Sequence, residues 1–374
     1  MLTPARFAIV ASWVTAATCF VSAVHGGDQP GEPTAKDIQP LIDKGLVFLK
    51  TQQAADGSFS AKRAGPGITA VVVAGLLRCG HSPKEPAIAK AIEYLEKSVQ
   101  KDGGIYDKAL ANYTTSVAVM ALKEGNKDGK YDSILKNAGN FLKGLQHEEG
   151  TTDLSKLNAG GFGYDKGSRP DMSNSAFTVE ALLAAGLTKD DPAVKKALEF
   201  LSKCQNLPSE QNKQPFATKA TADDLGGFTY VPDPKDSQYA TPGGGLRSLG
   251  GMTYGGLKSF LYAGVDKEDT RVKAAIAWIR KHYTVEENPG MGQSGLYYYY
   301  HTFAKAMDAL GENPFADAAG KKHFWKRELF DALVKRQQPA GSWRNAADKA
   351  FGETDPNLAT GFALLSLSYC QAKK

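Results

Sequence analysis

The chain has 374 residues, enough to bury a large hydrophobic core, and a formal net charge of +5, which is small for this length. Its lysines and arginines are interspersed with aspartates and glutamates. The charge pattern therefore excludes the basic footprint of a protein that binds nucleic acid or coats a membrane surface.

The first residues have the pattern of a secretory signal peptide. Residues 1–6 carry one positive charge, residues 7–24 are almost uncharged and mostly apolar or small, and small residues around Gly26 offer a cleavage point. We predict a signal peptide at 1–26, a flexible segment at 27–40, and export to the periplasm or the cell exterior. Retention of the apolar run as a membrane anchor is the alternative, although no basic stop-transfer cluster follows it. No second run of spanning length follows, so we expect no stable transmembrane segment after cleavage.

After cleavage the chain keeps three cysteines, Cys79, Cys204 and Cys370, at scattered positions. An odd number without regular spacing argues against a disulfide framework, although a single pair stays open.

A repeated pattern fills the rest of the chain. Residues 45–59 and 329–343 both predict an amphipathic helix followed by Gln-Gln and then by Gly-Ser and an aromatic residue. Four similar helices open between them, at Ala91, Ala138, Ala197 and Ala275, so the chain holds six units. Glycine-rich turns follow several of these first helices, because a tight turn with positive φ selects glycine.

Each unit continues with a second, more apolar helix. A first helix with one polar face and a second that is apolar almost all round indicate an outer and an inner layer. The first and last units resemble each other and neither looks like a polar cap, which favours closure of the sixth unit onto the first. We therefore predict an all-α fold, a six-plus-six α/α toroid over residues 41–374. The second helices are expected at 69–77, 114–122, 173–183, 249–262, 296–310 and 357–369.

The glutamine and Gly-Ser-aromatic elements resemble the repeats of squalene and hopene cyclases, and the Gly-Gly-Phe turns at 160–162 and 226–228 resemble those of protein prenyltransferase β subunits. The resemblance to this terpenoid cyclase and protein prenyltransferase superfamily covers residues 41–370. It implies a toroid with a central apolar cavity that holds an isoprenoid chain, and chemistry at the N-terminal ends of the inner helices. The repeat residues themselves are expected to be structural: the glutamines satisfy backbone groups at helix ends and the aromatic residues pack against the next unit.

The cyclases of this superfamily protonate their substrate with an Asp-x-Asp-Asp motif at the start of an inner helix. The matching stretch here keeps the first acid as Asp171 but has Ser173 and Asn174 at the two later positions. A serine hydroxyl cannot protonate a carbon–carbon double bond, because it holds its proton too tightly. These three residues are candidates for a cavity-facing site, with helix capping as the alternative role.

Protein prenyltransferases hold a zinc ion with Asp, Cys and His, and the resemblance places His301 at the histidine position. The Asp and Cys partners are missing one repeat earlier, at 248–254, and one histidine is not a zinc site. We therefore expect no metal and no cofactor.

Two further features add candidate residues. Tyr297 and His301 are four residues apart in an aromatic row that includes Tyr300, so they could line a cavity for an apolar chain, or equally form a packing layer. A glycine-rich stretch at 241–245, followed by Arg247, could contact an anion through backbone N–H groups. The candidate catalytic residues are thus Asp171 and His301, and the candidate cavity residues are Ser173, Asn174, Tyr297, Tyr300 and Arg247.

Three functions remain open from the sequence. The first is action on, or binding of, an isoprenoid-type lipid; as an enzyme the chain would be a terpenoid cyclase-like isomerase or lyase, or a prenyltransferase-like transferase. The second is a non-catalytic toroid that binds a lipid or a protein. The third is a carbohydrate lyase or hydrolase, which can also use an α/α toroid with Tyr, His and Arg, although the sequence identifies no facing pair of carboxylates.

Overall fold

The computed structural model describes residues 31–235, 237–348 and 350–371. The predicted signal peptide at 1–26 lies outside these residues, so export stays a prediction. The helical domain forms one compact unit that begins at Glu32.

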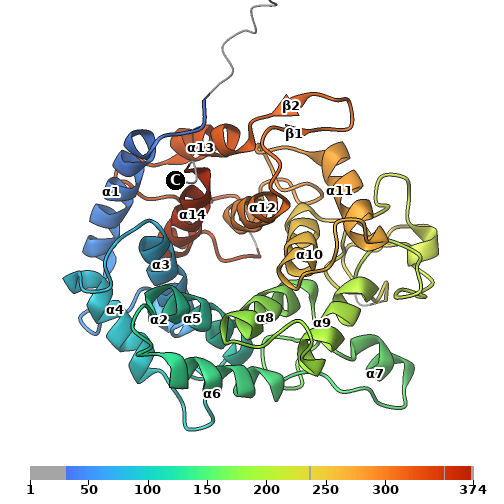
Figure 1. Ribbon diagram of the computed structural model, residues 1–374, viewed down its shortest axis with the longest axis horizontal. Helices are drawn as coiled ribbons and strands as arrows, with labels where there is room; N and C mark the ends of the chain where they lie inside the picture. The colour runs from blue at the N-terminus through green and yellow to red at the C-terminus, as the bar shows by residue number, and fades with distance from the viewer. Residues whose placement is uncertain (1–30, 236, 349, 372–374) are drawn as a thin grey trace, which may run out of the picture. The chain divides into compact units, whose positions relative to one another are not determined.

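Within the described residues, twelve long helices form two concentric rings (Figure 1), which confirms the predicted six-plus-six toroid. The outer ring consists of α1 (Ala35–Gln52), α4 (Pro86–Lys97), α6 (Asp132–Lys143), α9 (Pro192–Lys203), α11 (Thr270–His282) and α13 (Trp325–Arg336). The inner ring consists of α3 (Gly67–Arg78), α5 (Ala111–Gly125), α8 (Met172–Ala184), α10 (Gly250–Tyr262), α12 (Leu296–Leu310) and α14 (Pro356–Cys370).

Helix α1 begins six residues earlier than the predicted domain boundary at 41. Thr34 caps it in a reciprocal capping box with Asp37: the backbone N–H of Asp37 donates to the Thr34 hydroxyl, and the Asp37 carboxylate accepts from the Thr34 backbone. The prediction that 27–40 is flexible is therefore wrong for residues 35–40, because this cap was not recognised in the sequence.

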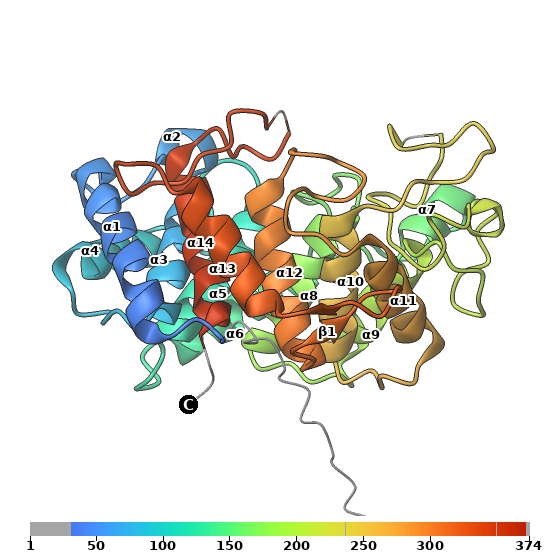
Figure 2. The same cartoon turned by 90° about the horizontal axis from the view of Figure 1, so that it is seen from above.

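Shorter elements occupy the connections. They are α2 (Ala61–Ala64), α7 (Asp153–Asn158), the 3₁₀ turn η1 (Ala217–Lys219) and a two-stranded antiparallel ribbon of β1 (Phe315–Ala316) and β2 (Lys322–His323). Figure 2 shows that the loops around α2 and α7 extend beyond the ends of the main helices.

The two rings differ in how their side chains are buried. In the outer helix α4 the buried positions are Ile88, Ala91, Ile92 and Leu95, one stripe at helical spacing. In the inner helix α14 nearly every residue is buried, because its neighbours in the ring and the outer layer cover it on several sides. No helix within the described residues is both long enough and apolar enough to cross a membrane.

Repeat glutamines join four of the units to the unit that follows. The side-chain amide of Gln53 donates to the carbonyl of Gly57 in its own turn, at 3.0 Å, and to the carbonyl of Ala87 in the first turn of α4, at 2.8 Å. The same double contact is made from Gln146 to Gly160 and Ala193, from Gln205 to Gly226 and Arg271, and from Gln337 to Gly341 and Leu41. The glutamines are structural, as predicted, but their acceptors are carbonyls of the turn and of the next outer helix rather than unpaired groups at a helix end.

The turn that follows an outer helix requires glycine, because the next outer helix approaches its backbone closely. Gly160 has φ of +88°, and a Cβ at this position would lie 2.1 Å from the carbonyl oxygen of Lys196 in the next outer helix. The residue two positions after such a glycine then donates its backbone N–H to a hydroxyl of the inner helix. These pairs are Phe59 with Thr69, Ile105 with Thr115, Phe162 with Ser175, Phe228 with Thr253, and Trp343 with Thr360.

The ring is closed by the same contacts that join its other units. Helix α14 packs against both α3 and α1, and the amide of Gln337 reaches Leu41 in the first helix at 2.9 Å. At this seam a Cβ on Gly361 would lie 2.9 Å from the Val71 side chain, so the two inner helices touch almost backbone to backbone. Closure was predicted from the similarity of the first and last units, and the seam explains that similarity.

Candidate functional site

The ring of inner helices surrounds a cavity of about 440 Å³, here named the main chamber. Its walls come from the first two turns of five inner helices: Ile68 of α3, Tyr113 of α5, Ser173 and Phe177 of α8, Tyr298 of α12, and Leu358 and Phe362 of α14. The chamber thus lies at the end of the toroid where the inner helices begin. A volume of this size suits a small organic ligand.

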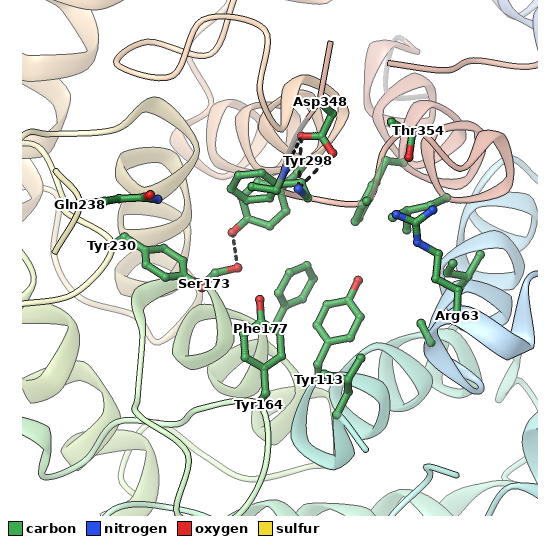
Figure 3. Close-up of a pocket in the computed structure, with 18 of the residues that line it drawn as sticks. Arg63, Tyr113, Tyr164, Ser173, Phe177, Tyr230, Gln238, Tyr298, Asp348 and Thr354 are labelled. Atoms are coloured by element: carbon green, nitrogen blue, oxygen red, sulfur yellow. Dashed lines mark hydrogen bonds between the residues drawn. The ribbon is translucent and has the colours of Figure 1, made fainter. Parts of the chain in front are cut away.

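The main chamber has an apolar floor and a polar mouth. Phe177, Phe362 and Ile68 form the apolar part, with ring centroids of Phe177 and Tyr298 5.9 Å apart. At the mouth, Figure 3 shows Arg63 and Gln238 on opposite sides of the space, and both side chains are exposed. A ligand with an apolar body and a polar end would match both surfaces.

Hydroxyl groups gather between the floor and the mouth. Tyr113, Tyr164, Tyr230 and Tyr298 line the chamber together with Ser173, whose hydroxyl donates to the Tyr298 oxygen at 3.0 Å (Figure 3). Burial raises the pKa of the Tyr113 and Tyr298 phenols above their usual value. These groups therefore stay protonated at neutral pH and act as hydrogen-bond donors and acceptors rather than as bases.

Of the cyclase-motif residues, Ser173 reaches the chamber, whereas Asp171 and Asn174 are used to start α8. Asp171 is buried and accepts the backbone N–H of Asn174 at 2.8 Å and its side-chain amide at 2.7 Å. This is the N-cap arrangement that the sequence left as the alternative. Burial raises the pKa of Asp171 to about 6, against the opposing effect of these hydrogen bonds, so this carboxyl is a weaker acid than an ordinary aspartate.

The structure separates Tyr297 and Tyr300 from the main chamber. Tyr300 donates its hydroxyl to the carbonyl of Val285, and Tyr297 is buried with its ring edge-on to Tyr300, 6.0 Å between centroids. The expectation that these residues line the cavity is wrong for both of them. Tyr297 and Tyr300 share one face of α12, and the rotation of the helix turns that face away from the main chamber. Tyr298 is the member of the row that does line it.

Arg247 also lies outside both chambers. Its side chain is exposed, its backbone N–H donates to the Tyr239 carbonyl, and it lines neither chamber of the described toroid. The stretch before it forms a surface turn, in which the hydroxyl of Thr241 accepts the N–H of Gly245.

His301 lies deeper in the ring, beside a second space of about 70 Å³, here named the inner chamber. Phe177 and Phe362 line both chambers, and the His301 ring stacks on Phe177 at 6.0 Å and packs on Phe362 at 5.4 Å. The seven residues proposed from the sequence therefore do not converge on one open cavity: Ser173 faces the main chamber and His301 the inner one.

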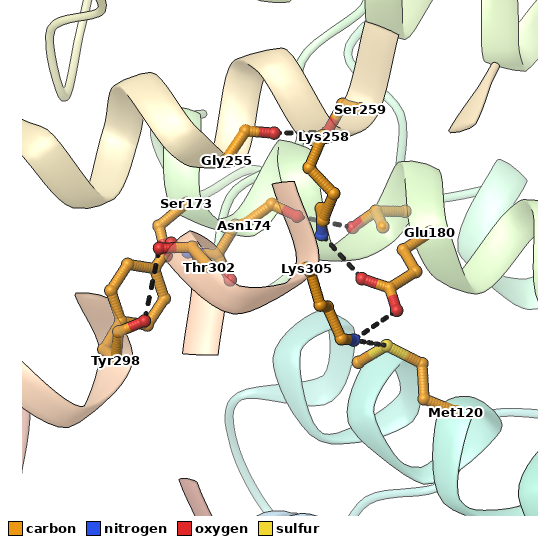
Figure 4. A network of polar contacts seen from close by, with 11 residues as sticks. Met120, Ser173, Asn174, Glu180, Gly255, Lys258, Ser259, Tyr298, Thr302 and Lys305 are labelled. Carbon is orange, nitrogen blue, oxygen red and sulfur yellow. Dashed lines mark hydrogen bonds and ion pairs between the residues drawn. The ribbon is translucent and has the colours of Figure 1, made fainter. Parts of the chain in front are cut away.

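The inner chamber contains a buried charge network that the sequence analysis missed. Glu180 of α8 accepts from Lys258 of α10 at 2.6 Å and from Lys305 of α12, and the Lys305 ammonium also contacts the Met120 sulfur (Figure 4). The signal was present in the sequence: Glu180 and Lys258 are the single charged residues of α8 and α10, and Lys305 lies in the largely apolar α12. Such a charge is buried only with a partner.

The main chamber offers binding groups but little acid–base chemistry. Its one lining carboxylate, Asp348, is buried, yet backbone N–H groups of Gly295, Phe351 and Glu353 hold its pKa below the usual value. It is a structural anchor for its loop, not a free carboxylate. Among the described residues no group of three potential Asp, Glu, His or Cys ligands is close enough to hold a metal ion, and Cys79, Cys204 and Cys370 are each free thiols.

Comparison with known proteins agrees with this architecture. The family model of the squalene-hopene cyclase C-terminal domain matches residues 62–221. None of the curated proteins compared with the chain is similar enough to match it.

Several solved structures share the fold at low sequence identity. The apo type II terpene cyclase MstE from Scytonema is 15% identical, with a TM-score of 0.53 over 90% of this chain and 98% of that one. Protein geranylgeranyltransferase-I from Candida albicans, solved with GGPP, is 12% identical, with a TM-score of 0.51 over 91% and 92% of the two chains. A family 88 glycosyl hydrolase from Bacteroides vulgatus is also 12% identical, with a TM-score of 0.54 over 90% and 99%. At this identity the likeness is one of fold, and it covers toroids with different chemistries.

Proposed function

We propose that this chain, a toroid of the terpenoid cyclase and protein prenyltransferase superfamily, binds an amphipathic isoprenoid-type lipid in the main chamber. The observation that carries the proposal is the division of the chamber into an aromatic floor and a layer of hydroxyl groups between that floor and the mouth. The apolar chain lies on Phe177 and Phe362, and the polar end accepts and donates hydrogen bonds at Tyr113 and Ser173. Burial of apolar chain surface supplies most of the affinity, and the hydroxyls set the orientation.

Binding is favoured over catalysis by the chemistry of the groups present. Acid-initiated cyclisation needs a strong acid that faces the substrate, whereas the carboxyl of Asp171 is turned toward the start of α8 and its pKa is raised. A carbohydrate lyase needs a base, and the chamber's buried phenols have raised pKa values. A hydrolase needs two facing carboxylates, and Asp348 is already occupied by backbone N–H groups.

The test is titration of the purified full chain with geranylgeraniol and, in parallel, with squalene, which has no polar end. Saturable binding of the alcohol is expected, weakened in Tyr113→Phe and abolished when Ser173→Trp fills the main chamber. Tyr300→Phe is the matched control, because its hydroxyl bonds outside the chamber. Equal affinity in the parent and in Ser173→Trp would contradict the proposal.

We further propose that the chain is exported through its N-terminal 26 residues. The support is the charge and apolar pattern of that segment. Cell fractionation followed by N-terminal sequencing of the mature protein tests it, with a start at Gly27 expected and an intact Met1 in the cytoplasm as the contrary result.

A further inference from the structure

The inner chamber is a separate space at the other end of the inner helices. Its walls include Arg78, the last residue of α3, Glu124 near the end of α5, and Lys305 of α12. The side chains of Arg78 and Glu124 are 29% and 30% exposed, so solvent reaches this end of the ring. The space of about 70 Å³ corresponds to roughly five water molecules.

Positive charge exceeds negative charge around this space. Arg78 and Glu124 neutralise each other in an ion pair of 2.6 Å. Glu180, by contrast, is a single carboxylate shared by two ammonium groups, Lys258 and Lys305, whose side chains are 2% and 5% exposed. One buried positive charge is therefore unmatched, which is costly in a protein interior unless an anion accompanies it.

The partial charges of helix ends do not account for Lys305. Lys258 lies four residues before the end of α10 at Tyr262, outside the last turn in which the C-terminal carbonyl groups favour a cation. Lys305 lies five residues before the end of α12 at Leu310, beyond the reach of that effect. Burial lowers the pKa of Lys305 to about 8, although Glu180 opposes this change, which agrees with an incomplete set of partners.

His301 supplies a second, independent observation. Its side chain is 1% exposed, it lines the inner chamber, and neither ring nitrogen has a hydrogen-bond partner. Burial, followed by the charge of Lys305, holds its pKa well below the usual value, so the ring is neutral and carries one N–H donor. A buried donor without a partner costs about 1–3 kcal/mol and calls for a ligand or another explanation.

We propose that the inner chamber binds a small oxyanion, a carboxylate or a phosphate, between the Lys305 ammonium and the His301 ring. The anion neutralises the excess positive charge of the Glu180 network and accepts a hydrogen bond from the His301 N–H. Its source is either a free anion or the acidic head of a lipid, and both present the same chemistry to these two residues. The site goes beyond lipid binding in the main chamber, because Phe177 and Phe362 stand between the two spaces.

The experiment is calorimetric titration of the full chain with acetate, inorganic phosphate and decanoate, at constant ionic strength in a buffer free of carboxylate and phosphate. Three variants accompany it. Lys305→Met removes the unmatched cation, and His301→Phe removes both nitrogens while keeping a ring between Phe177 and Phe362. Lys326→Met is the matched control, because this 7% exposed lysine pairs with Glu32 outside the chamber.

One equivalent of anion is expected to bind to the parent and to Lys326→Met, with affinity reduced about tenfold or more in each chamber variant. Binding of acetate or phosphate supports a free anion, and binding of decanoate alone supports a lipid head. If Lys305→Met does not fold, His301→Phe carries the test. Absence of binding by all three anions, or equal binding by the parent and His301→Phe, overturns the proposal. Because Ser173→Trp fills only the main chamber, it is expected to leave anion binding unchanged, which separates this result from the lipid test.

Discussion

At the scale of the residue, Asp171 shows that a residue at a catalytic motif position can serve as a helix cap instead. The sequence placed it at the first acid of a cyclase motif, and the structure uses its carboxylate to cap α8 through Asn174. The later positions of the motif, Ser173 and Asn174, cannot donate a proton to an alkene. The carboxylate is thus needed for the helix start, whatever the chamber binds.

The raised pKa of Asp171 predicts a pH dependence of stability. A carboxyl whose folded pKa of about 6 exceeds its unfolded value of 3.8 favours folding below the unfolded pKa, and this contribution is lost as the pH rises through 6. Between pH 4 and pH 6 the loss is on the order of 2 kcal/mol. Asp171→Asn, which can still cap the helix, is expected to remove this part of the slope, as measured by urea unfolding across that range; parallel profiles for parent and variant would show that Asp171 titrates normally.

His301→Phe makes a second prediction at this scale. Without a bound anion, the substitution removes two unpartnered buried nitrogens and keeps the stacking on Phe177. We expect the free energy of unfolding to rise by about 1 kcal/mol in buffer free of carboxylate and phosphate. Chemical denaturation measures it, and a loss of stability there would mean that the ring nitrogens already have partners.

At the scale of the element, the joint between units predicts the cost of losing one glutamine. Gln337→Ala leaves the carbonyls of Gly341 and Leu41 without their donor, so we expect a loss of about 1–3 kcal/mol in the free energy of unfolding. Gln52→Ala is the control, because this side chain is exposed and contacts only its neighbour Thr51; a change within about 0.5 kcal/mol is expected. Equal effects of the two substitutions in thermal or urea unfolding would refute the structural role of the repeat glutamine.

The helices could be predicted well from the sequence, whereas most of the residues that line the main chamber could not. All six inner helices appear within a few residues of their expected bounds, because apolar periodicity and turn glycines are local signals. Ser173 was found through the motif. Tyr113, Tyr164 and Tyr230 were missed because the last two lie on loops and all three meet only through the packing of successive units. Tyr297 was misplaced because its direction depends on the rotation of α12.

At the scale of the whole molecule, the seam between α3 and α14 decides whether the ring is closed. The two helices approach through Gly75 and Gly361, where a Cβ on Gly361 would lie 2.9 Å from Val71 and 3.1 Å from the backbone nitrogen of Val72. A methyl group there forces the helices apart. The first and last units are therefore coupled in the same way as neighbours along the chain.

Gly361→Ala is expected to destabilise the protein by about 1–3 kcal/mol through overpacking and to increase amide exchange in both α3 and α14. Gly255→Ala in α10 is the matched control, because the nearest atom to its Cβ is 3.7 Å away. There the gain in helix propensity predicts a stabilisation of about 0.4–1 kcal/mol. Increased exchange confined to α14 would indicate that the ring is not closed through α3.

The central claim is that the closed ring holds an amphipathic isoprenoid in the main chamber, and a crystal structure of the chain soaked with geranylgeraniol tests it most directly. The account predicts density for the chain along Phe177 and Phe362 with its hydroxyl beside Tyr113 and Ser173. An empty main chamber at saturating alcohol, or the alcohol bound on the outer helices instead, would contradict it.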